Sequence, residues 1–168
     1  VIDATDIATA GTAKVKVSTP GPNANTTAEL TFRIEAATPT AVFVDDGYAS
    51  LDPDTLINWP VGGPGTHIIG YDAFATVQGG VDGVATNGTI SVLDGTYAEN
   101  LAIGSKHVSF AGATDGDGKP LPTIRGSISI DSPAYPDTNW LIENINFVVD
   151  AANTITLKNV DQGATIRN

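Results

Sequence analysis

The sequence predicts an all-β fold in which short strands alternate with sharp bends and one amphipathic helix interrupts the pattern. One apolar residue, any residue and then Gly or Asn recur as a triplet, at residues 93–95, 110–112, 124–126, 142–144, 157–159 and 166–168. Gly and Asn adopt left-handed backbone conformations at low cost, so each triplet predicts a strand that ends in a bend.

The spacing of the triplets predicts a coil. Residues 142–144 (IEN) and 166–168 (IRN) lie 24 positions apart. Such a repeat fits one turn of a three-sided coil, with Ile142 stacked on Ile166 and Asn144 on Asn168. Aliphatic side chains would then face inward and pair between successive turns.

The period changes from strand to helix between residues 72 and 85. Apolar residues recur there every three or four positions, on one helical face: Phe74, Val77, Val81 and Val84. Asp72 is the expected N-cap, and residues 86–88 (TNG) are expected to end the helix. Because several Gly residues weaken it, we expect this helix to form only with its apolar face buried.

Residues 1–39 predict a small β segment. Apolar and polar residues alternate in 13–17 and again in 30–34, and a loop rich in turn-forming residues, GPNANT, separates the two runs. This pattern is typical of a hairpin with a long loop. Residues 35–40 (EAATPT) then predict a linker, and 41–44 (AVFV) a short apolar strand.

Two stretches resemble known families. The run IDATDIATAGTAKVKVSTPGPNANTTAELTFRI resembles the second half of an IPT/TIG-type immunoglobulin-like domain, which implies that residues 1–39 form part of a β-sandwich. The words YDAFATVQGGVDGV and GTISVLDGTYAEN resemble the entry of right-handed parallel β-helix proteins of the pectin-lyase-like class. This second resemblance implies that residues 40–168 form the start of such a β-helix, with the helix capping its N-terminal end.

Composition excludes several classes of partner. A net charge of −11 with eight Lys and Arg residues argues against binding to nucleic acid or to an anionic membrane surface. No apolar run approaches the roughly 18 residues that span a bilayer, so membrane insertion is not expected. The chain has no Cys, which excludes disulfides and thiolate metal sites.

The candidate metal ligands are aspartates in turn-like words. Asp115 and Asp117 form a D-x-D-G word, and such closely spaced carboxylates can converge on Ca²⁺. Asp52 and Asp54 are a weaker second candidate. No Glu follows at the spacing of an EF-hand, and Asp-Gly and Asp-Pro are also ordinary turn formers, so a solvated turn is the competing interpretation at both places. No cofactor is required by the sequence.

Catalytic motifs are not evident. His67 and His107 stand outside any zinc-protease or serine-hydrolase word, and we interpret both as structural. A polysaccharide lyase or hydrolase would need carboxylates or Arg on middle coils, where only Arg125, Glu143 and Arg167 are available. Asn25 and Asn87 begin glycosylation sequons.

These observations predict a non-catalytic structural or adhesive module of a secreted or cell-surface protein, such as a stalk, filament or surface layer. The expected partners are other copies of the chain or the remainder of a longer parent chain. The alternative is a β-helix protein that binds or degrades carbohydrate, as the pectin-lyase-like resemblance implies.

Overall fold

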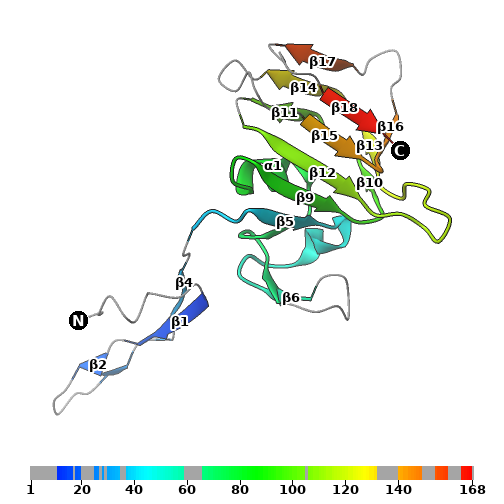
Figure 1. Cartoon of the computed structure of the whole chain (residues 1–168). Helices are drawn as coiled ribbons and strands as arrows, with labels where there is room; N and C mark the ends of the chain where they lie inside the picture. The colour runs from blue at the N-terminus through cyan, green and yellow to red at the C-terminus, as the bar shows by residue number, and fades with distance from the viewer. Residues whose placement is uncertain are drawn as a thin grey trace. The chain divides into compact units, whose positions relative to one another are not determined.

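The computed structural model describes residues 11–16, 18–19, 25–26, 28, 30–34, 37–58, 66–104, 106–131, 140–148, 154–158 and 164–167 (Figure 1). Two compact units make up the chain, Val1–Thr38 and Pro39–Asn168. The boundary between them lies within the predicted linker. Strands predominate, so the all-β class predicted from the sequence holds for the described part of the chain.

The first unit contains a long-armed hairpin. Strand β1 (Gly11–Val15) pairs antiparallel with β4 (Leu30–Ile34). Between them, β2 (Ser18–Thr19) pairs antiparallel with β3 (Asn25–Thr26), which extends the two arms toward the loop. This pairing confirms the predicted hairpin. Alternating apolar and polar residues favour such strands, because one face stays available for packing.

Three parallel sheets form most of the second unit (Figure 1). The six-stranded sheet contains β5 (Ala41–Val44), β8 (Ala73–Phe74), β9 (Gly88–Val92), β12 (Val108–Gly112), β15 (Trp140–Glu143) and β18 (Ala164–Arg167). One three-stranded sheet contains β10 (Thr96–Tyr97), β13 (Thr123–Arg125) and β16 (Asn146–Val148), and the other contains β11 (Leu101–Ile103), β14 (Ile128–Asp131) and β17 (Ile155–Lys158).

From β9 onward, the chain passes through the three sheets in a fixed cyclic order, and we call one such passage a coil. Each strand consequently pairs in parallel with the strand three elements later, as β9 does with β12, β10 with β13 and β11 with β14. In this register Ile142 lies opposite Ile166, which confirms the stack predicted from their spacing. Asn168 lies outside the described residues, so its stacking on Asn144 stays a prediction.

One apolar core joins the three sheets. Successive side chains of a strand point to opposite faces, and the inward positions are aliphatic or aromatic. In β9, for example, Ile90 and Val92 are buried, whereas the alternate residues Thr89 and Ser91 are only half-buried. Side chains from strands of all three sheets meet around the same interior: Leu101, Ile103, Phe110, Ile124, Ile128, Ile142 and Phe147.

The single α-helix of the described residues is shorter than the sequence predicts. Helix α1 (Val77–Gly83) begins after Thr76, whose side chain accepts from the Gly79 N–H at 3.0 Å and provides the N-cap. Asp72 is not the N-cap, because residues 73–74 form β8 and pair with β5 instead. The predicted apolar face is confirmed at its buried positions Val77, Val81 and Val84, whereas Phe74 lies on β8 and is partly buried against the core.

The bends have two different causes. Asn144 has a φ of 58°, so the left-handed bend predicted for residues 142–144 is confirmed. Gly95, Gly112 and Gly126 do not have positive φ, so the prediction of a left-handed bend is wrong for them, and Asn159 and Asn168 lie outside the described residues. A Cβ at Gly112 would collide with the Asn144 carbonyl, and one at Gly126 with the Glu99 carbonyl. Glycine is needed at these two bends because the backbone of the neighbouring coil passes close by.

The described residues of the connection between β5 and β8 pack against these two strands at one edge of the six-stranded sheet. The connection contains a 3-10 helix, η2 (Asp46–Ser50), and the antiparallel pair β6 (Leu56–Ile57) and β7 (His67–Ile68). A small second cluster of buried residues, Tyr48, Ile69 and Ala73, holds it in place.

Candidate functional site

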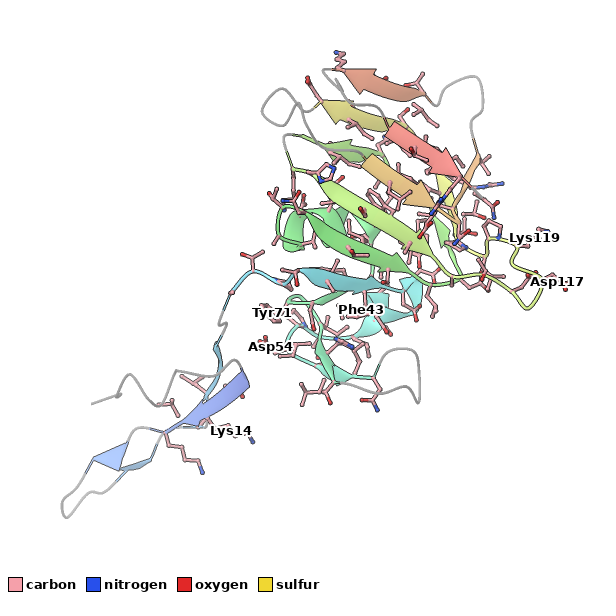
Figure 2. All side chains as sticks on the ribbon, viewed as in Figure 1. Lys14, Phe43, Asp54, Tyr71, Asp117 and Lys119 are labelled. Atoms are coloured by element: carbon pink, nitrogen blue, oxygen red, sulfur yellow. The ribbon has the colours of Figure 1, made fainter. Side chains whose placement is uncertain are left out.

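The loop that contains Asp115 and Asp117 is closed by its own backbone and side chains. Asp115 Oδ1 accepts from the backbone N–H groups of Asp117 at 3.0 Å and Lys119 at 2.9 Å. The Gly118 N–H donates to the Asp115 carbonyl at 3.0 Å, with Gly118 at a φ of 78°. Asp117 and Lys119 project from the outer end of this loop (Figure 2). The geometry matches a turn in which one carboxylate oxygen already serves the backbone.

Asp52 and Asp54 also lie in a turn. The Thr55 hydroxyl donates to the Asp52 carbonyl at 2.6 Å, and the Asp54 N–H donates to the Ile69 carbonyl at 2.9 Å. Asp54 has a φ of 67°, a conformation that Asp tolerates better than most residues. Among the residues that the structure describes, no group of three or more His, Asp or Glu side chains is arranged to hold a metal ion.

The neighbouring aspartates hold backbone groups rather than each other. Asp45 Oδ1 accepts from the Gly47 N–H at 2.9 Å and caps η2. Asp46 Oδ2 accepts from the Thr96 N–H at 3.2 Å, 50 residues away. Thr96 begins β10, which is the first strand of its three-stranded sheet. Asp45 therefore stabilises the start of η2, and Asp46 connects η2 to β10.

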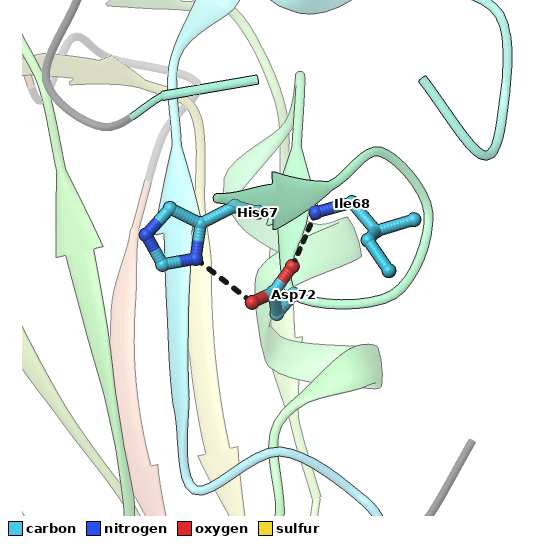
Figure 3. A network of polar contacts seen from close by, with 3 residues as sticks. All are labelled: His67, Ile68 and Asp72. Atoms are coloured by element: carbon cyan, nitrogen blue, oxygen red, sulfur yellow. Dashed lines mark hydrogen bonds and ion pairs between the residues drawn. The ribbon is translucent and has the colours of Figure 1, made fainter. Parts of the chain in front are cut away.

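His67 and Asp72 form the closest approach to a catalytic pair (Figure 3). His67 Nδ1 lies 2.8 Å from Asp72 Oδ2, and Asp72 Oδ1 accepts from the Ile68 N–H at 2.6 Å. The imidazole packs on the Phe43 ring, with centroids 4.0 Å apart. Carboxylate–imidazole pairs orient the base in hydrolases. Here the pair closes the turn between β7 and β8 and covers the outer face of β5.

The other titratable candidates join neighbouring strands. His107 Nδ1 lies 2.9 Å from Asn87 Oδ1, and the Asn87 N–H donates to the His107 carbonyl at 2.7 Å. Arg167 Nη2 lies 2.7 Å from Glu143 Oε2 across the β15–β18 pair. The Asn87 sequon thus has its amide oxygen engaged, whereas the side chain of Asn25 is outside the described atoms.

Glu99 and Lys106 hold α1 against the first coil, and neither residue was predicted to have a role. Glu99 Oε1 and Oε2 accept from the N–H groups of Val77 at 2.7 Å and Gln78 at 2.9 Å, so a carboxylate occupies the positive end of the helix dipole. At the other end, Lys106 Nζ donates to the carbonyls of Val81 and Asp82, both at 2.8 Å.

The Gln78 side chain hydrogen-bonds to the edge strand β11 in the way that a neighbouring strand would. Its amide oxygen accepts from the Ala102 N–H at 2.8 Å, and its amide nitrogen lies 3.3 Å from the Ala102 carbonyl. Ala102 is the middle residue of β11, the first strand of its sheet, so these bonds satisfy backbone groups at an edge. Helix α1 therefore both covers the core and occupies this edge.

A polar ladder continues this pattern along one corner of the stack. Asn100 Oδ1 accepts from the Ser127 N–H at 2.8 Å, and Ser127 Oγ accepts from the Thr154 N–H at 3.0 Å. The three residues stand 27 positions apart in sequence and precede β11, β14 and β17. We call Gln78, Glu99, Asn100, Lys106 and Ser127 the coil-binding network, because each binds the backbone of a neighbouring coil or of α1.

Two buried tyrosines, Tyr48 and Tyr97, have raised pKa values. Burial, followed by the nearby Asp45 carboxylate, raises the pKa of Tyr48 to about 12. Burial also raises the pKa of Tyr97, with the charge of Asp46 adding to the effect. The Tyr97 hydroxyl donates toward the carbonyls of Leu93 at 3.1 Å and Val44 at 3.4 Å, so it bridges the start of the coil and β5.

Comparisons of the chain with protein-family models, with curated proteins and with solved structures found no match. The two family resemblances therefore remain expectations from sequence words. Within the described ranges, no helix has the length and apolar character needed to cross a membrane.

We predict that Glu99→Gln lowers the free energy of unfolding by about 1–3 kcal/mol, because the amide replaces a charged, two-oxygen acceptor with one neutral oxygen at the helix start. Urea unfolding followed by circular dichroism measures the change. The matched control is Glu143→Gln, which removes an exposed ion pair worth roughly 0–1 kcal/mol. Equal losses in the two variants would show that Glu99 does not hold α1.

Proposed function

We propose that the chain is a non-catalytic structural or adhesive module of a secreted or cell-surface protein, built as a right-handed parallel β-helix that α1 caps at its N-terminal end. The cyclic order of the three sheets and the parallel pairing of each strand with the third strand after it support this architecture. The hand follows from the strong preference of parallel crossovers for right-handed connections. The first unit would form part of an immunoglobulin-like domain of the IPT/TIG type in the same surface protein.

The observation that carries the proposal is the use made of polar side chains. An enzyme site brings titratable groups together around a pocket that a substrate can enter. In this chain Glu99, Asp46 and Asp72 instead accept from backbone N–H groups, and Asn100 and Ser127 bind the next coil. Such contacts join neighbouring segments of a stack to one another, as a stalk or surface layer requires.

The test is an activity assay paired with an unfolding measurement. Purified protein is incubated with polygalacturonate and with a panel of neutral polysaccharides, with Ca²⁺ or with a chelator, and both new reducing ends and unsaturated products are followed. We expect no turnover. We also expect the chelator to leave the midpoint of thermal unfolding unchanged, because Asp115 Oδ1 is already bound by two backbone N–H groups.

Turnover that disappears in Asp115→Asn and Asp117→Asn variants would replace the proposal with the carbohydrate-degrading alternative. Tight, saturable binding of one polysaccharide without turnover would assign an adhesive role to the module.

A further inference from the structure

The sequence contains one Asp-Pro bond, between Asp52 and Pro53, and both residues are exposed in the turn that joins η2 to β6. An aspartate carboxylate can act as a nucleophile. When it attacks its own backbone carbonyl, the product is a five-membered cyclic anhydride, which forms without strain. Proline is a favourable leaving group in this reaction, because its tertiary peptide nitrogen accepts a proton more readily than the nitrogen of an ordinary peptide bond.

Thr55 donates two hydrogen bonds to the carbonyl oxygen of this same bond. Its hydroxyl oxygen lies 2.6 Å, and its backbone nitrogen 3.2 Å, from the Asp52 carbonyl oxygen. When a nucleophile adds to the carbonyl carbon, negative charge develops on that oxygen, and two donors already aimed at it stabilise the addition. The turn therefore provides a small oxyanion hole at the Asp-Pro bond.

The position of these donors is fixed by Ile69, which is 7% exposed and belongs to the small buried cluster. The Ile69 carbonyl accepts from the Asp54 N–H at 2.9 Å, and the Ile69 N–H donates to the Thr55 carbonyl at 3.0 Å. Two adjacent residues of the turn are thus tied to one buried residue. Donors that are held in place before a reaction need no reorganisation during it.

The Asp52 carboxylate is available to act as the nucleophile. Four other aspartates are already engaged by backbone N–H groups: Asp45, Asp46, Asp72 and Asp115. Asp52 is exposed, and its carboxylate accepts no hydrogen bond from any residue that the structure describes. It can therefore rotate onto its own carbonyl carbon, which a carboxylate that closes a turn cannot do.

We infer that the chain cleaves itself between Asp52 and Pro53 in mildly acidic solution. An Asp52 carboxylate oxygen attacks the Asp52 carbonyl carbon while Thr55 holds the carbonyl oxygen. The bond to the Pro53 nitrogen breaks, the nitrogen keeps the electron pair and takes a proton from the solvent, and the cyclic anhydride remains. One water molecule then opens the anhydride, which leaves a C-terminal aspartate on residues 1–52 and an N-terminal proline on residues 53–168. Each chain reacts once with its own backbone, so the inference goes beyond the proposed function without making the module a catalyst.

The fragment that ends at Asp52 is expected to stay in the fold, because it contains β5. This strand pairs in parallel with β8 and with β9, and its residues Val42 and Val44 are completely buried in the core. Tyr48 of η2 is buried as well. Cleavage would therefore cut the covalent connection before β6 and leave the six-stranded sheet assembled.

The test follows the purified full chain in mildly acidic and in neutral buffer, at an acidity at which circular dichroism shows the chain to be folded. Denaturing gels and intact mass should reveal residues 1–52 and 53–168 in the acidic sample, and the two fragments should elute together in native size-exclusion chromatography. The rate should not depend on protein concentration. A synthetic peptide of residues 49–58 has the same bond without the fixed turn, and we expect it to react at least about tenfold more slowly.

Variants identify the groups that act. Asp52→Asn removes the nucleophile and should abolish cleavage, whereas Asp54→Asn is the matched control and should cleave at the native rate. Thr55→Val should slow the reaction at least about tenfold, and Thr55→Ser, which keeps the hydroxyl, should restore it.

Three results would overturn the inference: a folded chain that stays intact in acid, a peptide that reacts as fast as the folded chain, or an unchanged rate in Thr55→Val. A rate that rises with protein concentration would also overturn it, because cleavage would then occur between molecules or by a protease. Fragments that separate in native chromatography would refute the retention of β5. The polysaccharide assay is unaffected by all of these outcomes, so this inference and the proposed function fail separately.

Discussion

Phe110→Ala is expected to lower the free energy of unfolding of the second unit by about 3–5 kcal/mol, as removal of a buried aromatic ring usually does. Among the residues whose burial the structure describes, Phe110 is the largest of the fully buried side chains, at 2% exposure. It lies on β12, between Ile90 of β9 and Ile142 of β15 in the register, so the missing ring leaves a void between three successive coils. Because domains are stable by only about 5–15 kcal/mol, the loss is a large fraction of the total.

Urea unfolding monitored by circular dichroism measures this effect. Leu56→Ala is the control, because Leu56 is 58% exposed on β6 and its truncation should change stability by less than about 0.5 kcal/mol. Phe110→Leu should lose less than Phe110→Ala, since it keeps part of the volume. A Phe110→Ala variant as stable as the Leu56→Ala variant would mean that the sheets do not share one core.

The strands and the core were predictable because their signals are local. A strand with one buried face needs an apolar residue at every second position, and Ile90, Val92, Phe110 and Ile142 all follow that rule. The stack of Ile142 and Ile166 followed from a simple repeat length. In the same way, Val77, Val81 and Val84 could be assigned to the core from their spacing alone.

The start of the helix was not predictable from local rules. Asp72 and Thr76 are both good N-cap residues, and sequence alone does not choose between them. Pairing with β5, some thirty positions earlier, holds residues 73–74 in an extended conformation. Asp72 is then engaged by the Ile68 N–H and by His67, so Thr76 becomes the cap.

The contacts of the coil-binding network were missed for a related reason. Glu99 binds α1 more than twenty residues before it, and Asn100 binds Ser127 one coil later. Such partners become visible only when the register between coils is known. The word GTYAEN marked this place in the sequence, but no local motif links Glu99 to residues 77–78.

Gly112→Ala is expected to destabilise the second unit by about 3 kcal/mol, at the upper end of the usual cost of overpacking. A Cβ at this position would collide with the Asn144 carbonyl oxygen, and it would lie 2.7 Å from the Asn144 carbonyl carbon and 2.8 Å from Pro122 Cγ. The atoms it meets first belong to the backbone of the next coil, which cannot move without breaking the pairing of β12 with β15. Gly104→Ala is the control, because a Cβ at Gly104 has no atom within 4 Å.

A second substitution separates the two possible reasons for glycine at this bend. If Gly112 were required for a left-handed backbone, Asn would replace it better than Ala, since Asn tolerates that conformation. If the close approach of the Asn144 backbone is the reason, Gly112→Asn should lose at least as much stability as Gly112→Ala. At position 144, φ is 58°, so the left-handed backbone is the constraint there. Asn144→Gly should therefore be tolerated better than Asn144→Ala. Thermal unfolding of the four variants decides between the two explanations, and a Gly112→Asn variant of native stability would refute the close-approach explanation.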